Sequence, residues 1–274
     1  MESTQMTSEM ASLKDRLRST WIAGDFGVIA RSIETGAEEF VARLDLKSGM
    51  SVLDVACGTG NLALPAATAG AAVTGIDIAP NLIEQAIERA KAEGITAKFE
   101  VGDAEALPYP DESFDVVMTM FGAMFAPRPH VTASELVRVC KEGGTVAMAN
   151  WTPEAFTGQM FKLGAKHVPP PPGMPSPVMW GTEDAVRERL KDGIADLQMT
   201  RRKIMFHYPM DPAGVVDLFR QYFGPTVVAF SKLDPDGQAA LRSDLEALWT
   251  EHNQATDGTT AVESEYLEVR ATKR

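Results

Sequence analysis

Apolar runs of strand length alternate with helical patterns through the first half of the chain. The runs cover residues 50–55, 72–77, 98–101, 115–119 and 145–149. Most of them are apolar almost throughout, which is typical of parallel strands that are buried on both faces. Stretches with apolar residues three and four positions apart separate these runs. The alternation predicts an α/β fold with a doubly wound, mostly parallel sheet.

The N-terminal part of the chain has helical patterns only. Residues 6–17 and 28–44 carry apolar side chains at helical spacing, and an aromatic segment with Trp21 and Phe26 joins them. Amphipathic helices of this kind bury one face against a neighbouring element. Trp21 and Phe26 either close over a ligand pocket or serve as core aromatics between the two helices.

The second half of the chain predicts two more strands and several helices. Residues 199–208 and 261–270 alternate as strands do. A proline-rich loop covers residues 168–178. Helical patterns cover residues 151–167, 183–191 and parts of 211–253.

The first strand runs into a glycine turn that opens a helix. Gly58 and Gly60 allow a tight turn and a close approach of the backbone to a ligand. The spacing Gly58-x-Gly60-x-x-Ala63 also satisfies the dinucleotide-binding fingerprint. Asp54, however, places a carboxylate inside the apolar strand just before the turn. Because it would repel a pyrophosphate there, Asp54 favours a ligand with positive charge.

Four ordered segments resemble the class I S-adenosylmethionine (SAM) methyltransferases. They are residues 52–61, Asp77, residues 102–104 and residues 138–144. In the first segment Ala56 takes the place of the first glycine of the family's pattern. The Arg-Val-Cys-Lys-Glu-Gly-Gly block at 138–144 resembles the ubiquinone and menaquinone biosynthesis type, or methyltransferase type 11. Together the segments extend the resemblance over about residues 47–150.

The resemblance implies SAM as the cofactor and assigns its contacts. The cofactor-binding residues would be Asp54, Ala56, Gly58 and Gly60 at the methionine end, Asp77 and Ile78 at the ribose, Asp103 and Ala104 at the adenine, with Phe121 and Trp21 as walls. Asp77 follows the second strand, where an acid accepts both ribose hydroxyl protons, as it also would for NAD. Asp103 would accept a hydrogen bond from the exocyclic amine of adenine.

The resemblance also implies a domain plan. A Rossmann-like, seven-stranded sheet with an antiparallel C-terminal strand would occupy residues 46–274. Residues 1–45 would form N-terminal helices of a lid. Further lid insertions would lie at about 151–193 and 211–256, so that a helical lid encloses the active site.

Methyl transfer from a sulfonium does not require a particular catalytic side chain. The reaction is an in-line displacement that gains most from alignment of the reactants and exclusion of water. A nitrogen or sulfur acceptor needs no base, whereas a hydroxyl usually does. The catalytic residue therefore stays unknown, with His130, His167 and Tyr222 as candidates beside simpler turn, surface or lid roles. His207 and Tyr208, at a strand end, favour a structural role.

No metal site is expected. Catechol-type methyltransferases that use a metal carry acids after strands four and five, but here those ends read Met120-Phe121 and Asn150-Trp151. The chain has two cysteines, Cys57 and Cys140, without metal-type spacing.

Composition limits the partners. The chain of 274 residues has a net charge of −12, so its surface repels phosphate backbones and anionic membranes. We therefore expect a small-molecule acceptor rather than nucleic acid or a membrane. The polar first twelve residues lack the apolar core of a signal peptide, which favours a cytoplasmic location. The sequence says nothing about oligomeric state.

Three alternatives stay open. An NAD-dependent oxidoreductase would use the same glycine turn, but no tyrosine is followed by lysine at the Tyr-x-x-x-Lys spacing. A non-catalytic SAM-binding protein would keep the cofactor site without turnover. Within the methyltransferases, a quinone-precursor C-methyltransferase is an alternative to another small-molecule acceptor, since O, N, C and S acceptors are not distinguished by sequence.

Overall fold

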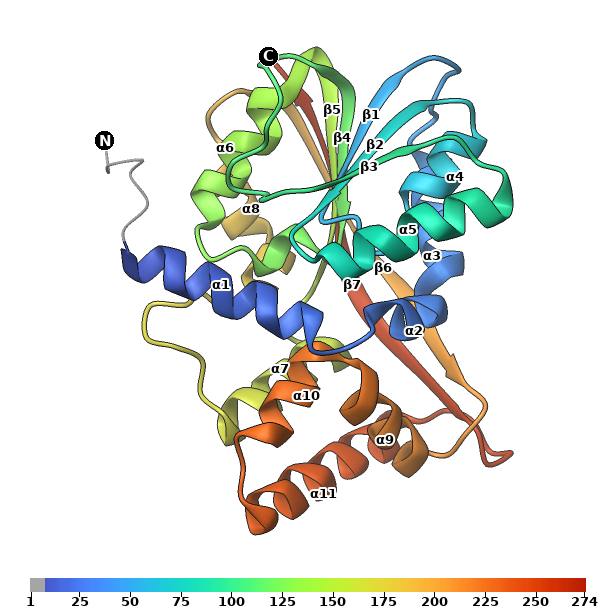
Figure 1. The fold of residues 1–274 in the computed structure, drawn as a ribbon, viewed down its shortest axis with the longest axis vertical. Coiled ribbons are helices and arrows are strands. Elements are labelled where there is room, and N and C mark those ends of the chain that lie inside the picture. Colours follow the sequence, from blue (N-terminus) through green and yellow to red (C-terminus); the bar gives the residue numbers. More distant parts are fainter. Residues whose placement is uncertain (1–7) are drawn as a thin grey trace.

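The computed structural model describes residues 8–274, which fold around one seven-stranded sheet (Figure 1). The strands are β1 (Ser51–Val55), β2 (Ala72–Asp77), β3 (Lys98–Val101), β4 (Phe114–Met120), β5 (Cys140–Trp151), β6 (Ile194–Tyr208) and β7 (Thr260–Lys273). Their order across the sheet is β3-β2-β1-β4-β5-β7-β6. Only β7 runs against its neighbours β5 and β6, while the pairs from β3 to β5 are parallel. The predicted α/β sheet with an antiparallel C-terminal strand is confirmed.

The strand order creates a crevice beside the first strand. The chain passes from β1 to β2 and β3 on one side and then returns to β4 and β5 on the other. Ligands of open α/β sheets bind outside the carboxyl ends of the strands at such a switch point. Val52 and Leu53 of β1 are fully buried, so the strand that leads into the crevice is anchored in the core.

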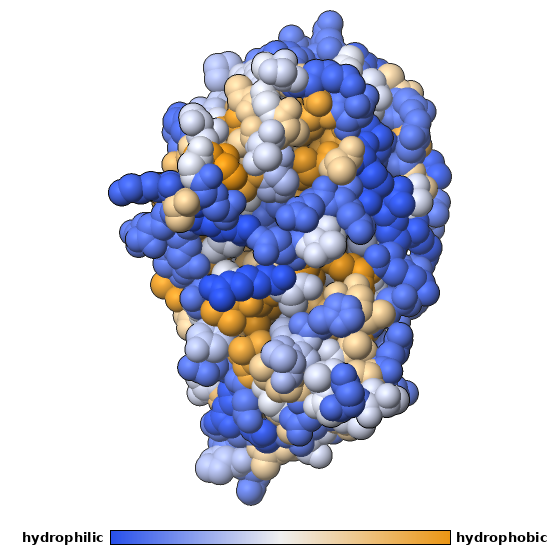
Figure 2. Space-filling view, turned by 90° about the vertical axis from the view of Figure 1, so that its right-hand side faces the viewer, coloured by the Kyte–Doolittle hydropathy of each residue, from blue (hydrophilic) through white to orange (hydrophobic). Residues whose placement is uncertain are grey.

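Helices cover both faces of the sheet. Figure 1 shows α3 (Glu34–Arg43), α4 (Ala63–Thr68) and α5 (Pro80–Glu93) on one side, and α6 (Pro129–Val139) and α8 (Glu183–Leu190) on the other. Figure 2 shows the flank with the first group, where hydrophobic residues gather in patches above and below a hydrophilic band. Hydrophilic residues make up most of this flank.

A second helical group lies beyond the carboxyl ends of β1 and β4. We call α1 (Ser8–Ile22), α7 (Phe156–His167), α9 (Pro212–Tyr222), α10 (Gly224–Ser231) and α11 (Pro235–His252) the helical cap. Figure 1 shows the last four below the sheet and α1 crossing between them and the strand ends. The long strands β6 and β7 extend toward the cap, and α7 and α11 pack on β7. The segment 151–193 contributes α7 to the cap, whereas α8 packs beside α6.

Several element boundaries differ from the sequence expectation. The strand expected at 145–149 begins earlier, at Cys140, which opens β5 and pairs with Phe114, because α6 ends at Val139 and the chain turns directly into the sheet. The expected helix 28–44 is divided into α2 (Phe26–Ala30), a 3-10 turn at Arg31–Ile33 and α3. Part of the expected helix 6–17 lies outside the described residues, and its remainder continues as α1 through Trp21. In residues 8–274 no helix is both long and apolar enough to cross a membrane.

Candidate functional site

The turn after β1 has a left-handed backbone and is tied to β2 by a hydrogen bond. Ala56 has φ 57° and Gly58 has φ 53°, both in the left-handed region. The N–H of Cys57 donates to the carbonyl of Ile76 at 3.1 Å, which ties the turn to β2. Glycine is the residue that adopts this conformation without cost, which explains why the family's pattern has a glycine where this chain has Ala56.

Asp54 is a buried carboxylate with one oxygen unpaired. Its side chain is 1% exposed, and Oδ2 has no hydrogen-bond partner among the described residues. Burial raises the pKa of Asp54 to about 8. The hydrogen bond from the backbone N–H of Ala63 favours the ionised form and lowers the pKa, but this effect is smaller than that of burial. Because Asp54 also lines the main cavity, a cationic ligand there would restore its charge and satisfy the free oxygen.

Asp77 closes the other side of the turn. Its Oδ2 accepts the N–H of Gly58 at 2.9 Å, and its Oδ1 accepts the N–H of Ala79 at 2.9 Å. Burial nevertheless raises its pKa above the usual value. Each carboxylate oxygen keeps lone pairs for further donors, so Asp77 fixes the glycine turn and can still accept hydroxyl protons from a ligand.

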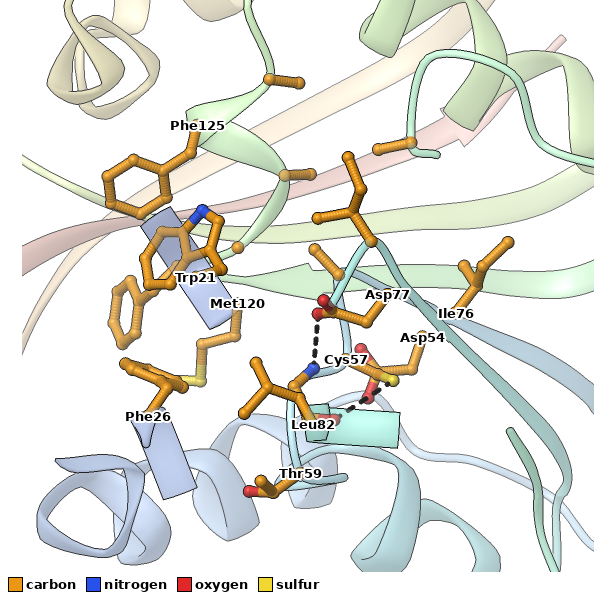
Figure 3. A pocket seen from close by; sticks show the side chains of 18 of the residues that line it. Trp21, Phe26, Asp54, Cys57, Thr59, Ile76, Asp77, Leu82, Met120 and Phe125 are labelled. Atoms are coloured by element: carbon orange, nitrogen blue, oxygen red, sulfur yellow. Dashed lines mark hydrogen bonds between the residues drawn. The ribbon is translucent and has the colours of Figure 1, made fainter. Parts of the chain in front are cut away.

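Nine of the ten predicted cofactor positions line one cavity. Its empty volume is about 1080 Å³ including the open mouth. These nine are Trp21, Asp54, Ala56, Gly58, Asp77, Ile78, Asp103, Ala104 and Phe121. Gly60 is not part of the lining, because its place is in the turn, where an added Cβ would lie 3.3 Å from Leu64 and Phe99. Figure 3 shows Asp54 and Asp77 on one side of this cavity and Trp21, Phe26 and Phe125 across from them.

Lys14 is the site residue that the sequence reasoning missed. It lies on α1, is 8% exposed, and its Nζ is 2.5 Å from Asp103 Oδ2 and 2.6 Å from Glu105 Oε2. Glu105 also pairs with the guanidinium of Arg128 at 2.8 Å. Lys14 therefore fastens α1 over the cavity. Its signal in the sequence was a lysine four residues after Met10 and three before Leu17, on the apolar face of the helix.

A second cavity, which we call the aromatic chamber, adjoins the first. Its volume is about 480 Å³, and it shares Trp21, Phe26, Ile33, Phe121 and Phe125 with the first cavity. The remaining lining is Ile29, Trp151, Phe156, Thr157, Met160, Phe161, Phe206, Phe219, Phe223 and Trp249. Sheet and cap residues thus form one apolar enclosure at the end of β4.

Phe121 marks the junction of the two cavities. It has φ 58°, an unusual conformation for a bulky residue, and its N–H donates to the carbonyl of Ala149 at 2.9 Å. Its ring stacks on Trp151 with centroids 3.6 Å apart and planes 7° apart. The stacking and the hydrogen bond hold the strained residue, so the ring has a fixed orientation at the junction.

None of the three catalytic candidates lines either cavity. His130 has a side chain that is 65% exposed, with Nδ1 3.7 Å from Glu188. His167 Nε2 lies 2.8 Å from Asp244 of α11. Tyr222 accepts the N–H of Asp25 with its backbone carbonyl. Within residues 8–274 no group of three or more His, Cys, Asp or Glu side chains is arranged to hold a metal ion.

Comparison with known proteins relates the N-terminal half of the sheet to methyltransferases. A family model described as "Methyltransferase domain" matches residues 52–144. The chain is 36% identical over 250 residues to uncharacterized protein Rv1403c of Mycobacterium tuberculosis, covering 90% of this chain and 91% of that protein. It is 44% identical over 107 residues to 2-methyl-6-phytyl-1,4-hydroquinone methyltransferase of Synechocystis, covering 39% of this chain and 33% of that enzyme.

A solved structure shares the fold. Phosphoethanolamine N-methyltransferase 2 of Haemonchus contortus, in complex with S-adenosyl-L-methionine, matches with a TM-score of 0.56 and 18% identity. The match covers 87% of this chain and 52% of that protein. At this identity the likeness concerns the fold alone.

Asp54→Asn should be more stable than the wild type, by a free energy of unfolding that grows as the pH rises. The folded state binds the Asp54 proton more tightly than the unfolded state, so the wild type loses stability between about pH 4 and its folded pKa of about 8. The loss is about 1.4 kcal/mol for each pH unit in that window. Urea unfolding of Asp54→Asn and wild type should show a stability difference that grows from pH 5 to pH 8 and then levels off. A difference that is the same at every pH would contradict this origin.

Replacing Ala56 with Gly should raise stability by up to about 1 kcal/mol, because the left-handed backbone no longer carries a Cβ. Ala67→Gly is the matched control. Ala67 is also half-buried but lies in α4, where glycine should cost up to about 1 kcal/mol. Thermal unfolding of the two variants should therefore shift in opposite directions, and a destabilised Ala56→Gly would refute the strain argument.

Replacing Lys14 with Met should loosen α1. Glu105 keeps Arg128, but Asp103 loses the cation that lies 2.5 Å away. Loss of such a charged contact costs about 1–3 kcal/mol, so amide exchange in residues 8–22 should accelerate roughly tenfold or more. Hydrogen exchange with mass spectrometry measures this, with Arg16→Met on the exposed face of α1 as control. Equal exchange in both variants would show that Lys14 does not fasten the helix.

Proposed function

Because this chain belongs to the class I S-adenosylmethionine-dependent methyltransferases, we propose that it transfers the methyl group of SAM to a small-molecule acceptor inside the capped cavity. The observation that carries the proposal is the unpaired oxygen of Asp54, which is buried at the cavity wall. A cofactor whose amino-acid end carries an ammonium group satisfies this oxygen. An anionic pyrophosphate at the same place would leave it repelled and unpaired.

Each polar part of the cofactor would contact a different residue around the turn. Asp54 would hold the ammonium at the methionine end, with Gly58 leaving room for the backbone to approach. Asp77 would accept the ribose hydroxyls while it keeps its bonds to Gly58 and Ala79. Asp103 would accept the adenine amine through lone pairs that Lys14 does not use. This arrangement fits SAM because its ammonium, its ribose hydroxyls and its adenine amine each meet a carboxylate acceptor.

The cofactor supplies a methyl group on a positively charged sulfur. The protein aligns this carbon with an acceptor and keeps water away from both. The junction between the two cavities is suited to that task, since Trp21, Phe121 and Phe125 line both of them. No side chain has to donate or remove a proton for the displacement itself.

A second candidate is methylation of a quinone precursor on carbon. The likeness to a hydroquinone methyltransferase favours it, although that likeness covers only 39% of this chain. The aromatic chamber is also compatible with a ring-shaped acceptor. Activity on hydroquinone substrates would decide for this candidate.

Calorimetry with S-adenosylhomocysteine and with NAD tests the cofactor. The wild type should bind the homocysteine product and not NAD. Asp77→Ala and Asp54→Asn should each weaken that binding by roughly 30-fold or more, since each removes a charge-assisted hydrogen bond of about 2–3 kcal/mol. Asp236→Asn, an exposed carboxylate on α11, is the control for loss of one charge.

The competing readings give other results. Binding of NAD without binding of S-adenosylhomocysteine would overturn the proposal in favour of an oxidoreductase. Binding of S-adenosylhomocysteine without methyl transfer from labelled SAM to any acceptor would instead support a non-catalytic SAM-binding protein.

A further inference from the structure

We propose that the acceptor is a thiol with an apolar, ring-sized body, bound in the aromatic chamber and methylated on its sulfur as the thiolate, without a base from the protein. This inference rests on the proposed function and adds the class of the substrate. Three features of the described residues carry it: the lining of the chamber, the lining of the junction, and the charge balance of the transfer.

Among the described residues, the aromatic chamber offers no charged group to the body of a ligand. The polar groups of its lining are the indole N–H donors of Trp21, Trp151 and Trp249 and the hydroxyl of Thr157, whose Oγ1 is 2.9 Å from Ser264 Oγ. The N–H of Thr157 also donates to that hydroxyl at 3.1 Å. Burying a phosphate or carboxylate beside such walls would cost several kcal/mol. The body of the acceptor is therefore apolar, and flat enough to lie among the rings of Phe161 and Phe223, whose planes are 30° apart.

Among residues 8–274, no acid or base lines the junction. Its five shared residues are aromatic or aliphatic, with Trp21 5.8 Å from Phe26 and 5.0 Å from Phe125 between ring centroids. The ionisable residues of the first cavity are Lys14, Asp54, Cys57, Asp77 and Asp103. Figure 3 shows Asp54, Cys57 and Asp77 across the cavity from Trp21, Phe26 and Phe125. A hydroxyl at the junction would thus keep its proton.

The apolar surroundings favour a transfer that removes charge. The thiolate sulfur lies at the junction, where the sulfonium of the cofactor pairs with it and offsets the cost of burying the anion. A lone pair of the thiolate forms the S–CH₃ bond while the bond from the methyl carbon to the sulfonium breaks, and its electron pair stays on the cofactor sulfur. One anion and one cation become two neutral thioethers, and no proton moves. An amine would instead leave a cation in the low-dielectric chamber. A thiol, with a pKa of about 8.5 in its alkyl form, is ionised by water far more often than a phenol, at about 10.

Two probes with the same body separate the steps. 2-Naphthalenethiol and 2-naphthol should both bind to the protein saturated with S-adenosylhomocysteine, as measured by calorimetry. With labelled SAM at pH 7, only the thiol should be methylated above the rate without protein, at least tenfold faster than the naphthol. Because titration of protein groups affects the methylation of both probes alike, the ratio of their methylation rates reports the chemistry of the acceptor atom. Phosphoethanolamine, a charged acceptor that is tested with the same labelled SAM, should neither bind nor react.

A pair of variants on α7 places the body of the probe. Phe161 lines the aromatic chamber but not the first cavity. Leu163 is half-buried like Phe161 but lines neither cavity. Phe161→Ala should weaken binding of 2-naphthalenethiol about tenfold through lost ring contacts, with unchanged binding of S-adenosylhomocysteine. Leu163→Ala should change neither.

Each contrary result overturns a defined part. Loss of S-adenosylhomocysteine binding in the wild type would refute the proposed function. With that binding intact, failure of the thiol to bind or to be methylated would refute the acceptor class. Methylation of 2-naphthol at the rate of the thiol, or turnover of phosphoethanolamine, would refute transfer without a base in an apolar chamber.

Discussion

The burial of an unpaired carboxylate at the end of the central strand constrains the rest of this site. Asp54 lies between Gly75 of β2 and Met118 of β4 in the register of the sheet, so it cannot turn toward solvent. One oxygen is left to whatever enters the crevice. The protein therefore carries a destabilising group in its free state, and the ligand that removes the cost is positively charged.

The two halves of the enclosure come from different parts of the fold and have opposite chemistry. The carboxyl ends of β1 and β2 supply Asp54 and Asp77 to the first cavity, and the loop after β3 supplies Asp103. The cap helices α7, α9 and α11 supply four rings of the aromatic chamber, which are Phe156, Phe161, Phe219 and Trp249. Because the conserved geometry of the sheet serves the cofactor half, differences in acceptor between relatives of this fold would reside in the cap.

Helix α1 links the two halves. Lys14 reaches the polar side through Asp103 and Glu105, and Trp21, two turns later, reaches the aromatic side through Phe26 and Phe125. One helix thus contacts both the position expected for adenine and the junction where transfer is proposed. Opening of α1 would expose both at once, which makes entry of cofactor and acceptor depend on the same movement.

The resemblance to the methyltransferases implied the antiparallel last strand. The sequence by itself determined the α/β sheet and the positions of the acidic and glycine residues around the turn. These depend on hydrophobic period and local backbone conformation, which neighbouring residues specify. The tertiary structure decided which side chains from distant segments meet. Lys14 and Asp103 are 89 positions apart, and the chamber joins Trp21, Phe121 and Trp249, so no local pattern marks them as neighbours. The same packing leaves His130, His167 and Tyr222 outside both cavities, because burial and contact across the fold, not residue type, decide which groups reach the site.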